Sequence, residues 1–440
     1  MRLPREFFAL VAAMHFNIVT LFPEFFASPL QTSLMGRAGE AGLVSFALLN
    51  PRDYAPDKHR SVDDRPYGGG PGMVMMLDPL LRCLRGIENP GRILVPAPGA
   101  RPFTQARARE LAAGESMTIV CGRYEGLDAR LGELAPLEYA SVGEAVVSGG
   151  EAAALMMMEA VARLVPGFMG KEASGDEESF SRGLLEYPHY TRPEVFEGLP
   201  VPDVLRCGDH AKVAAWRRGR SLESTLRLRP ELLAEAQLDE DDAIFLRAVP
   251  CERPGRNLYL CLVHYPVLLK TKNPGASSLT NLDIHDIARS SCGYGLGGLY
   301  VSTPLSDQAR ILRDILRYWT RGAGAVSNPD RAWALSLVRH APEIADAVAD
   351  IEERAGQRPL VLGTSAEWRK PPVYTPGMVR EALATGPVLL LLGTSHGLAP
   401  EALAASDGQL RPLRLLDAYR RLSVRAAATA YVDRILNDFY

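Results

Sequence analysis

Two glycine turns, each expected at the end of a strand, constrain this chain more than any other feature. Ser116-Met-Thr-Ile-Val-Cys121 leads into Gly122-Arg-Tyr-Glu-Gly126, and Val147-Ser-Gly-Gly150 opens a helix-forming run over residues 151–159. A strand that ends in glycine lets a ligand approach the backbone without a Cβ in the way. A glycine turn before a helix also presents unpaired amides. The turns therefore predict either one small-molecule pocket lined by backbone or two ordinary strand-to-helix turns.

Apolar segments alternate with helix-forming segments up to residue 165, which predicts an α/β domain with a largely parallel sheet. One helix is expected over residues 77–90, and strands are expected over residues 15–21, 43–49, 92–95 and 116–121. Ligands bind such sheets beyond the carboxyl ends of the strands, where both glycine turns fall. The glycine-rich residues 63–73 lack the Gly-Lys-Ser/Thr sequence of a phosphate-binding P-loop.

The composition is that of a globular protein with 47% hydrophobic and 23% charged residues, and 440 residues favour roughly two to four domains. Because the net charge is only −3, local basic patches must hold any nucleic acid. The six cysteines include no Cys-x-x-Cys pair and no histidine partners, which indicates reduced thiols in the cytoplasm and no metal site. No apolar run is long enough to span a membrane. We interpret residues 1–13 as an upstream extension that mimics a weak signal peptide.

A second part of the chain begins near residue 169. Helix formers over residues 210–236 predict a small helical module, which follows an irregular polar stretch. Its basic residues predict either a phosphate-binding face or a solvated helix surface, and they are Lys212, Arg217, Arg218, Arg220, Arg227 and Arg229. We expect residues 169–240 to form this module with its preceding loop, and residues 241–256 to be a linker.

A second α/β unit is expected over residues 257–440. Its predicted strands are residues 257–263, 298–301, 359–362 and 387–392. The last of these ends in Gly393-Thr-Ser-His-Gly-Leu398, so the chain uses a strand followed by a glycine turn for a second time.

Residues 14 to about 240 resemble the TrmD type of bacterial tRNA (guanine-N1)-methyltransferase. The matching blocks, in fixed order, are Leu21-Phe-Pro-Glu24, residues 63–73, residues 122–126, Ser148-Gly-Gly150, Pro188-His-Tyr-Thr-Arg-Pro193 and Arg229-Pro-Glu-Leu-Leu233. The resemblance implies a SPOUT fold for residues 14–168, with a parallel sheet tied in a deep trefoil knot. It also implies S-adenosylmethionine as the methyl donor, held largely by backbone groups of the knot.

The donor site that the resemblance implies coincides with the two glycine turns. By residue-to-residue match it would contain Pro96, Gly122, Tyr124, Glu125, Gly126, Val142, Gly143, Glu144, Ala145, Val146, Val147, Gly149 and Gly150. Ala145 stands where the family commonly has an aromatic residue, and Pro98-Gly-Ala100 replaces a more usual Pro-Gln-Gly.

The chemistry also needs a base, because guanine N1 carries a proton that must leave when the methyl group arrives. The family's base is an aspartate just before Ser-Phe. Glu178 occupies that position here, with Asp176 and Glu177 as alternatives. Arg163 matches the arginine assigned to guanine binding and to stabilising charge on O6.

Guanine N1 is blocked inside a Watson–Crick pair, so the target base must be unpaired and turned outward. The resemblance implies the guanosine 3′ of the tRNA anticodon, a homodimer with sites built from both subunits, and a helical domain that grips tRNA. The family is also associated with magnesium, although no ligand cluster in this sequence requires it. A competing interpretation, favoured by glutamate at position 178, is a non-catalytic protein that binds S-adenosylmethionine and tRNA.

The C-terminal unit resembles a second family of SPOUT-like predicted RNA methyltransferases. The matching blocks are residues 280–289, residues 393–398 and Leu422-Ser-Val-Arg-Ala426. In SPOUT proteins the latter two commonly border the donor site. The alternative is a degenerate duplicate that only binds RNA or stiffens the dimer. His285, Asp286 and Arg289 share helical spacing and are either functional or surface residues.

Overall fold

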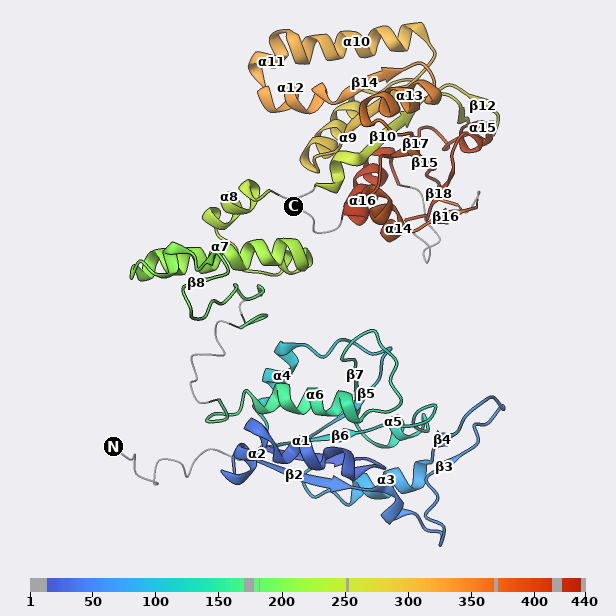
Figure 1. The fold of residues 1–440 in the computed structure, drawn as a ribbon. Coiled ribbons are helices and arrows are strands. Elements are labelled where there is room, and N and C mark those ends of the chain that lie inside the picture. The colour runs from blue at the N-terminus through green and yellow to red at the C-terminus, as the bar shows by residue number, and fades with distance from the viewer. Residues whose placement is uncertain are drawn as a thin grey trace. The chain divides into compact units, whose positions relative to one another are not determined.

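The computed structural model describes residues 14–169, 178–181, 183–250, 253–367, 371–413 and 422–436. The chain forms two compact units, residues 1–182 and 183–440 (Figure 1). Asp176 and Glu177, the alternative bases, lie outside the described residues.

The first unit is built on a five-stranded sheet in which every neighbouring pair is parallel, as the sequence predicts. In spatial order its strands are β2 (Val44–Leu49), β1 (Met14–Val19), β6 (Ser116–Val120), β5 (Arg92–Pro96) and β7 (Leu137–Ala140). Helices cover both faces because strands buried on both sides carry nearly continuous apolar side chains. Phe16 and Met117 belong to the core on one face, and Val19 and Val120 to the core on the other.

The helices of this unit are α1 (Ala27–Gln31), α2 (Ser33–Glu40), α3 (Leu77–Arg85), α4 (Gln105–Ala112), α5 (Leu131–Leu134) and α6 (Glu151–Ala162). The remaining short strands are β3 (Asp63–Asp64) and β4 (Val74–Met75), which pair antiparallel. The helix expected over residues 77–90 ends at Arg85, which corrects that prediction. Gly86 caps the helix, and Pro90 cannot continue it.

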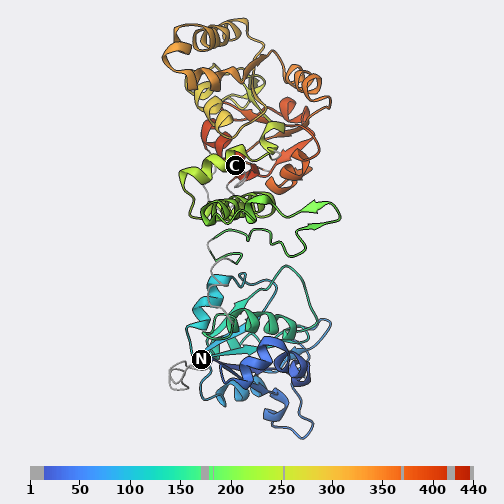
Figure 2. The ribbon, with the colours of Figure 1, turned by 60° about the vertical axis from the view of Figure 1, so that its left-hand side comes forward.

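The second unit begins with the helical module, which consists of α7 (His210–Leu228), a 3-10 turn over Pro230–Ala234 and α8 (Glu240–Ala248). Leu222, Leu226, Leu233 and Leu246 form its buried core. Within the predicted helical module over residues 210–236, α7 ends before Pro230, which lacks the N–H that a continuous helix needs. Figure 2 shows β8 (Val195–Phe196) and β9 (Leu199–Pro200) extending past the end of α7.

The linker expected over residues 241–256 is also corrected, because α8 occupies its first half. The acidic run that suggested a linker instead starts this helix. Asp239 and Asp242 form a capping box, in which each side chain accepts a hydrogen bond from the other residue's amide. Asp242 is further bound by Arg218, with Nη2 to Oδ2 at 2.6 Å and Nε to Oδ1 at 3.1 Å.

The Arg218–Asp242 pair makes the stability of the helical module depend on pH. Hydrogen bonds from Arg218 hold the pKa of Asp242 below its ordinary value. The stabilisation is therefore complete above that ordinary value and is lost as the pH falls toward the lowered one. We expect Asp242→Asn to cost about 2 kcal/mol of unfolding free energy near neutral pH. Urea titrations near neutral pH and in acid, with unfolding detected by hydrogen exchange of the α7 amides, measure the cost of the substitution and the pH dependence. Asp241→Asn, at an exposed neighbour, should change neither.

The larger part of the second unit is a seven-stranded sheet, also parallel at every pair. Its strands in spatial order are β14 (Val338–Ala341), β13 (Gly298–Ser302), β10 (Leu258–Val263), β17 (Val388–Gly393), β15 (Leu360–Gly363), β18 (Gly408–Leu410) and β16 (Val373–Tyr374). The inner five, β13-β10-β17-β15-β18, repeat the chain order of β2-β1-β6-β5-β7 in the first sheet. The two units therefore share one sheet topology.

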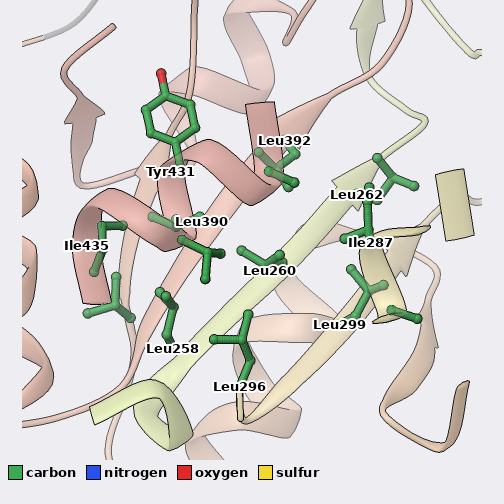
Figure 3. Close-up of a cluster of buried hydrophobic side chains, with 14 of the residues drawn as sticks. Leu258, Leu260, Leu262, Ile287, Leu296, Leu299, Leu390, Leu392, Tyr431 and Ile435 are labelled. Carbon is green, nitrogen blue, oxygen red and sulfur yellow. The ribbon is translucent and has the colours of Figure 1, made fainter. Parts of the chain in front are cut away.

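Helices again cover this sheet, and they are α9 (Asn281–Gly293), α10 (Ser306–Arg321), α11 (Ala323–Ser327), α12 (Pro329–Ser336), α13 (Ile344–Ala355), α14 (Pro376–Leu383), α15 (Pro400–Ala404) and α16 (Val424–Leu436). Figure 3 shows one core, where Leu260 of β10 and Leu390 of β17 face Ile287 of α9 and Ile435 of α16. Two further short strands, β11 (Val267–Leu268) and β12 (Pro274–Gly275), pair antiparallel beside the sheet.

Candidate functional site

Three loops converge at the carboxyl edge of the first sheet, after β5, β6 and β7. The loops after β5 and β7 are joined by backbone hydrogen bonds, with Ser141 N to Arg101 O at 2.8 Å and Phe103 N to Ser141 O at 2.7 Å. The two glycine turns are joined by Gly150 N donating to Gly122 O at 2.9 Å. The predicted residues Pro96, Gly122, Gly126, Gly149 and Gly150 thus border one cradle of backbone, which we call the front cradle.

Close packing explains Gly150 of the front cradle, and backbone conformation explains Gly126. A Cβ on Gly150 would stand 2.9 Å from Cys121 Cα, so only glycine lets α6 start against the end of β6. Gly126 has φ +116°, a conformation that side chains disfavour, and a Cβ there would face open space. Tyr124 also has positive φ, at +58°, and its ring is half exposed.

The loop between β7 and α6 supplies the remaining predicted donor residues, Val142, Gly143, Glu144, Ala145, Val146 and Val147. Val146 is 88% exposed although it is apolar. Glu125, another predicted donor residue, packs against Gly72. A Cβ placed on Gly72 would lie 2.4 Å from the Glu125 carboxylate. The loop over residues 63–73 therefore contacts the front cradle.

A buried ion pair that the sequence reading missed connects the two glycine turns. Glu151, only 1% exposed, starts α6 and pairs with Arg123 of the first turn, with Oε2 to Nη2 at 3.0 Å and Oε1 to Nε at 3.2 Å. Thr20 at the end of β1 donates to the same carboxylate at 2.9 Å. The Arg123 guanidinium also covers the Phe22 ring at 4.4 Å. The available signal was a charged residue at the start of a helix whose next seven residues are all apolar.

The turn after β17 in the second unit repeats the turn after β6. Ser395 and Gly397 have φ of +54° and +101°, matching +58° and +116° at Tyr124 and Gly126. In each turn the second glycine's amide donates to the carbonyl three residues earlier, at 3.1 Å in the first and 3.0 Å in the second. Equivalent strands therefore end in the same turn conformation, in agreement with the repeated pattern in the sequence.

A pocket of about 290 Å³ lies at this second turn, and we call it the rear pocket. It is lined by residues 393–398, by residues 364–367 after β15, by residues 422–424 at the start of α16, and by Asp283 and Tyr431. Burial raises the pKa of Tyr431 to about 12, so its phenol stays protonated. His285, Asp286 and Arg289 are not among the residues that line the pocket.

Glu178 and Arg163, predicted to act together, form an ion pair in which the two side chains are 34% and 35% exposed. Arg163 caps the carboxyl end of α6. The 12 residues of α6 span about 18 Å. Since α6 starts at the front cradle, the ion pair lies at its far end. Gly167, which follows, packs against Leu43 just before β2, at the amino edge of the sheet.

The basic side chains of the helical module are largely paired within it. The pairs are Lys212–Asp209, Arg218–Asp242, Arg220–Glu223, Arg227–Glu223 and Arg229–Glu231. Arg217 stacks over the Tyr187 ring at 4.8 Å. The phosphate-binding role of this face stays a prediction.

Comparison with known proteins decides the family. The model of the family described as tRNA (guanine-1)-methyltransferase TrmD matches residues 14–235, half of the chain. The chain belongs to this TrmD family. A second family model, described as SAM-dependent RNA methyltransferase, matches residues 257–437. Both resemblances inferred from the sequence are thereby confirmed.

Relatives of TrmD type occur with and without the second domain. Proteins named tRNA (guanine-N(1)-)-methyltransferase from Nitratidesulfovibrio vulgaris and Oleidesulfovibrio alaskensis are 62% and 59% identical, over 97% of this chain and 100% of theirs. A protein of the same name from Geobacter metallireducens is 50% identical over 53% of this chain and 96% of its own. The TrmD segment therefore corresponds to nearly the whole length of that shorter relative.

The described residues also bear on membrane-spanning helices and on clusters of metal-binding side chains. Within the described ranges, no helix is long and apolar enough to cross a membrane. Nor do the described residues contain a group of three or more His, Cys, Asp or Glu that could hold a metal ion.

Proposed function

We propose that this TrmD chain transfers the methyl group of S-adenosylmethionine to N1 of the guanosine 3′ of the anticodon in tRNA. The Arg163–Glu178 ion pair carries the proposal. The reacting edge of guanine places the N1–H donor beside the O6 acceptor. A carboxylate beside a guanidinium offers the matching acceptor and donor.

The two side chains supply what the reaction needs beyond positioning. The sulfonium of the donor makes its methyl group electrophilic. Glu178 takes the N1 proton as N1 attacks the methyl carbon in line. Arg163 stabilises the negative charge that develops on O6.

The front cradle fits a donor held by backbone groups. Gly126 faces open space, and Gly122 and Gly150 keep side chains away from the junction of the two turns. Pro96 and Gly149 would complete the contacts from the neighbouring loops, and the exposed Val146 would be covered. The tight start of α6 against β6 supports the proposal that this region is the trefoil knot.

The position of the ion pair supports the proposal of a homodimer. Glu178 and Arg163 lie at the opposite end of α6 from the front cradle, about 18 Å away along the helix. A methyl group moves only between atoms already in contact. We therefore propose that the front cradle of one subunit works with the Glu178 and Arg163 of its partner.

We further propose that the helical module binds the tRNA and that the protein acts in the cytoplasm, where tRNA is. Phosphates would compete for arginines of the module that are now paired with carboxylates. Magnesium bound mainly by RNA phosphates would need no cluster of protein ligands. In the second domain, we propose that the rear pocket binds S-adenosylmethionine, because its turn has the conformation found in the front cradle.

Methylation of tRNA transcripts tests the proposal. We expect the full chain to label a transcript with guanosine 3′ of the anticodon, yielding 1-methylguanosine on nucleoside mass spectrometry. A matched transcript with adenosine at that position should yield none. Donor binding without methylation of either transcript would contradict the enzyme and support the non-catalytic alternative.

A further inference from the structure

The rear pocket contains a partly buried carboxylate that the proposed donor binding does not use. Among its described lining residues, the carboxylates are Asp283 and Glu367. Glu367 is exposed, whereas the Asp283 side chain is only 18% exposed. Asp283 is the third residue of α9, so a helix rather than a loop holds it in place.

Two neighbours fix the orientation of the Asp283 carboxylate. The Thr280 hydroxyl donates to Oδ2, and the Arg425 Nε lies 3.1 Å from Oδ1. Arg425 is the second residue of α16 and also pairs with Asp286 at 2.9 Å. An ionised carboxylate has about four lone-pair sites, so these contacts leave room for another donor.

The polar groups behind the carboxylate add no second positive charge. His264, 1% exposed, is hydrogen-bonded to Ser277 at 2.9 Å, and Ser277 is hydrogen-bonded to Thr394 of the rear pocket. Burial lowers the pKa of His264 to about 4, which keeps its ring neutral near pH 7. Arg425 is therefore the charged partner of Asp283.

We propose that Asp283 is the catalytic base of the second domain and that the acceptor is a ring N–H of a nucleobase in RNA. This rests on the proposed donor binding in the rear pocket. The methyl–sulfur bond breaks and leaves its electron pair on sulfur, while a methyl–nitrogen bond forms. The ring proton passes to the Asp283 carboxylate and then to water. A carboxylate is a weak base, which suits an imino N–H and not the far less acidic ribose hydroxyl.

The test compares Asp283→Asn with Asp286→Asn in the full chain. Both variants remove one carboxylate from Arg425 and leave the other, but Asp286 is not among the pocket residues. The probe is total RNA from cells in which the gene for this protein lacks codons 257–440. This RNA is incubated with each purified chain and labelled S-adenosylmethionine. Nucleoside mass spectrometry then separates 1-methylguanosine from any other methylated base, and equilibrium dialysis counts the donor molecules bound per chain.

We expect two donors bound per chain in all three proteins and a second methylated base with the parent chain. Asp283→Asn should slow its formation by about 100-fold or more, whereas Asp286→Asn should retain most of the rate. Formate should partly rescue Asp283→Ala, which a merely structural role would not allow. Unchanged turnover by Asp283→Asn, or methylation of a ribose hydroxyl, would overturn the proposal. Two bound donors without a second product would overturn it too, whereas one bound donor would refute donor binding in the rear pocket.

Discussion

Isolated mixed dimers of a Glu178→Ala chain and a Gly126→Leu chain have about half of the parental tRNA methylation, although neither variant is active alone. The reason is the 12-residue helix α6, which separates the ion pair from the front cradle within one chain. Random pairing makes about half of the dimers mixed, and each mixed dimer has one intact site of two. Co-expression with two affinity tags isolates these dimers for assay with the tRNA transcript.

Each variant removes a different half of the site. Glu178→Ala removes the base, which we expect to lower turnover by about 100-fold to 1000-fold without changing donor affinity. Gly126→Leu forces a side chain into a backbone conformation with φ +116° and into the open space of the front cradle. Donor binding to this variant should be lost, as equilibrium dialysis can show.

The matched control pairs Glu178→Ala with Arg163→Ala. These residues form one ion pair, so both variants damage the same half of the site. Neither chain of this mixed dimer keeps a complete ion pair, so no site is intact and we expect no recovery. With a Gly126→Leu chain as the partner, the Glu178→Ala chain and the Arg163→Ala chain should recover equal methylation activity. No combination of these variants has more than one intact site per dimer. Inactive mixed dimers of Glu178→Ala and Gly126→Leu would show that one chain supplies the entire site.

Strands and glycine turns were predictable because their signals are local. Residues 387–392 are a continuous apolar run and residues 116–121 end in one, as is typical of buried parallel strands, and they correspond closely to β17 and β6. Element ends were less predictable. The acidic run at residues 239–242 looked like a solvated linker. In the structure its carboxylates accept hydrogen bonds from backbone amides and form a capping box, and the residue types alone do not reveal these hydrogen bonds.

Contacts between distant residues were beyond the sequence alone. Thr20 and Glu151 are 131 positions apart, and only the parallel order of β1 and β6 brings them together. The separation of Arg163 from the front cradle depends likewise on the direction of α6. A residue-by-residue family match names the members of a site but does not say which of them one chain can bring together.

Glu151→Ala should cost the first unit about 3–5 kcal/mol of unfolding free energy, since removing one member of a buried ion pair leaves the other uncompensated. Glu151 is 1% exposed and Arg123 is 22% exposed. The Thr20 hydroxyl, itself buried, would lose its acceptor as well. Because the chain has two units, urea unfolding is best followed by hydrogen exchange of the β6 amides, which report on the first unit alone.

The double variant Glu151→Met with Arg123→Met separates loss of the ion pair from loss of packing. Replacing both charges with apolar side chains of similar volume removes the unpaired charge, so the double variant should be more stable than Glu151→Ala. It should nevertheless bind S-adenosylmethionine more weakly, because Arg123 also donates to Ser148 O at 3.3 Å and so holds the second glycine turn. A Glu151→Ala cost below about 1 kcal/mol would assign the pair no structural role. Unchanged donor affinity in the double variant would show that the turns keep their geometry without it.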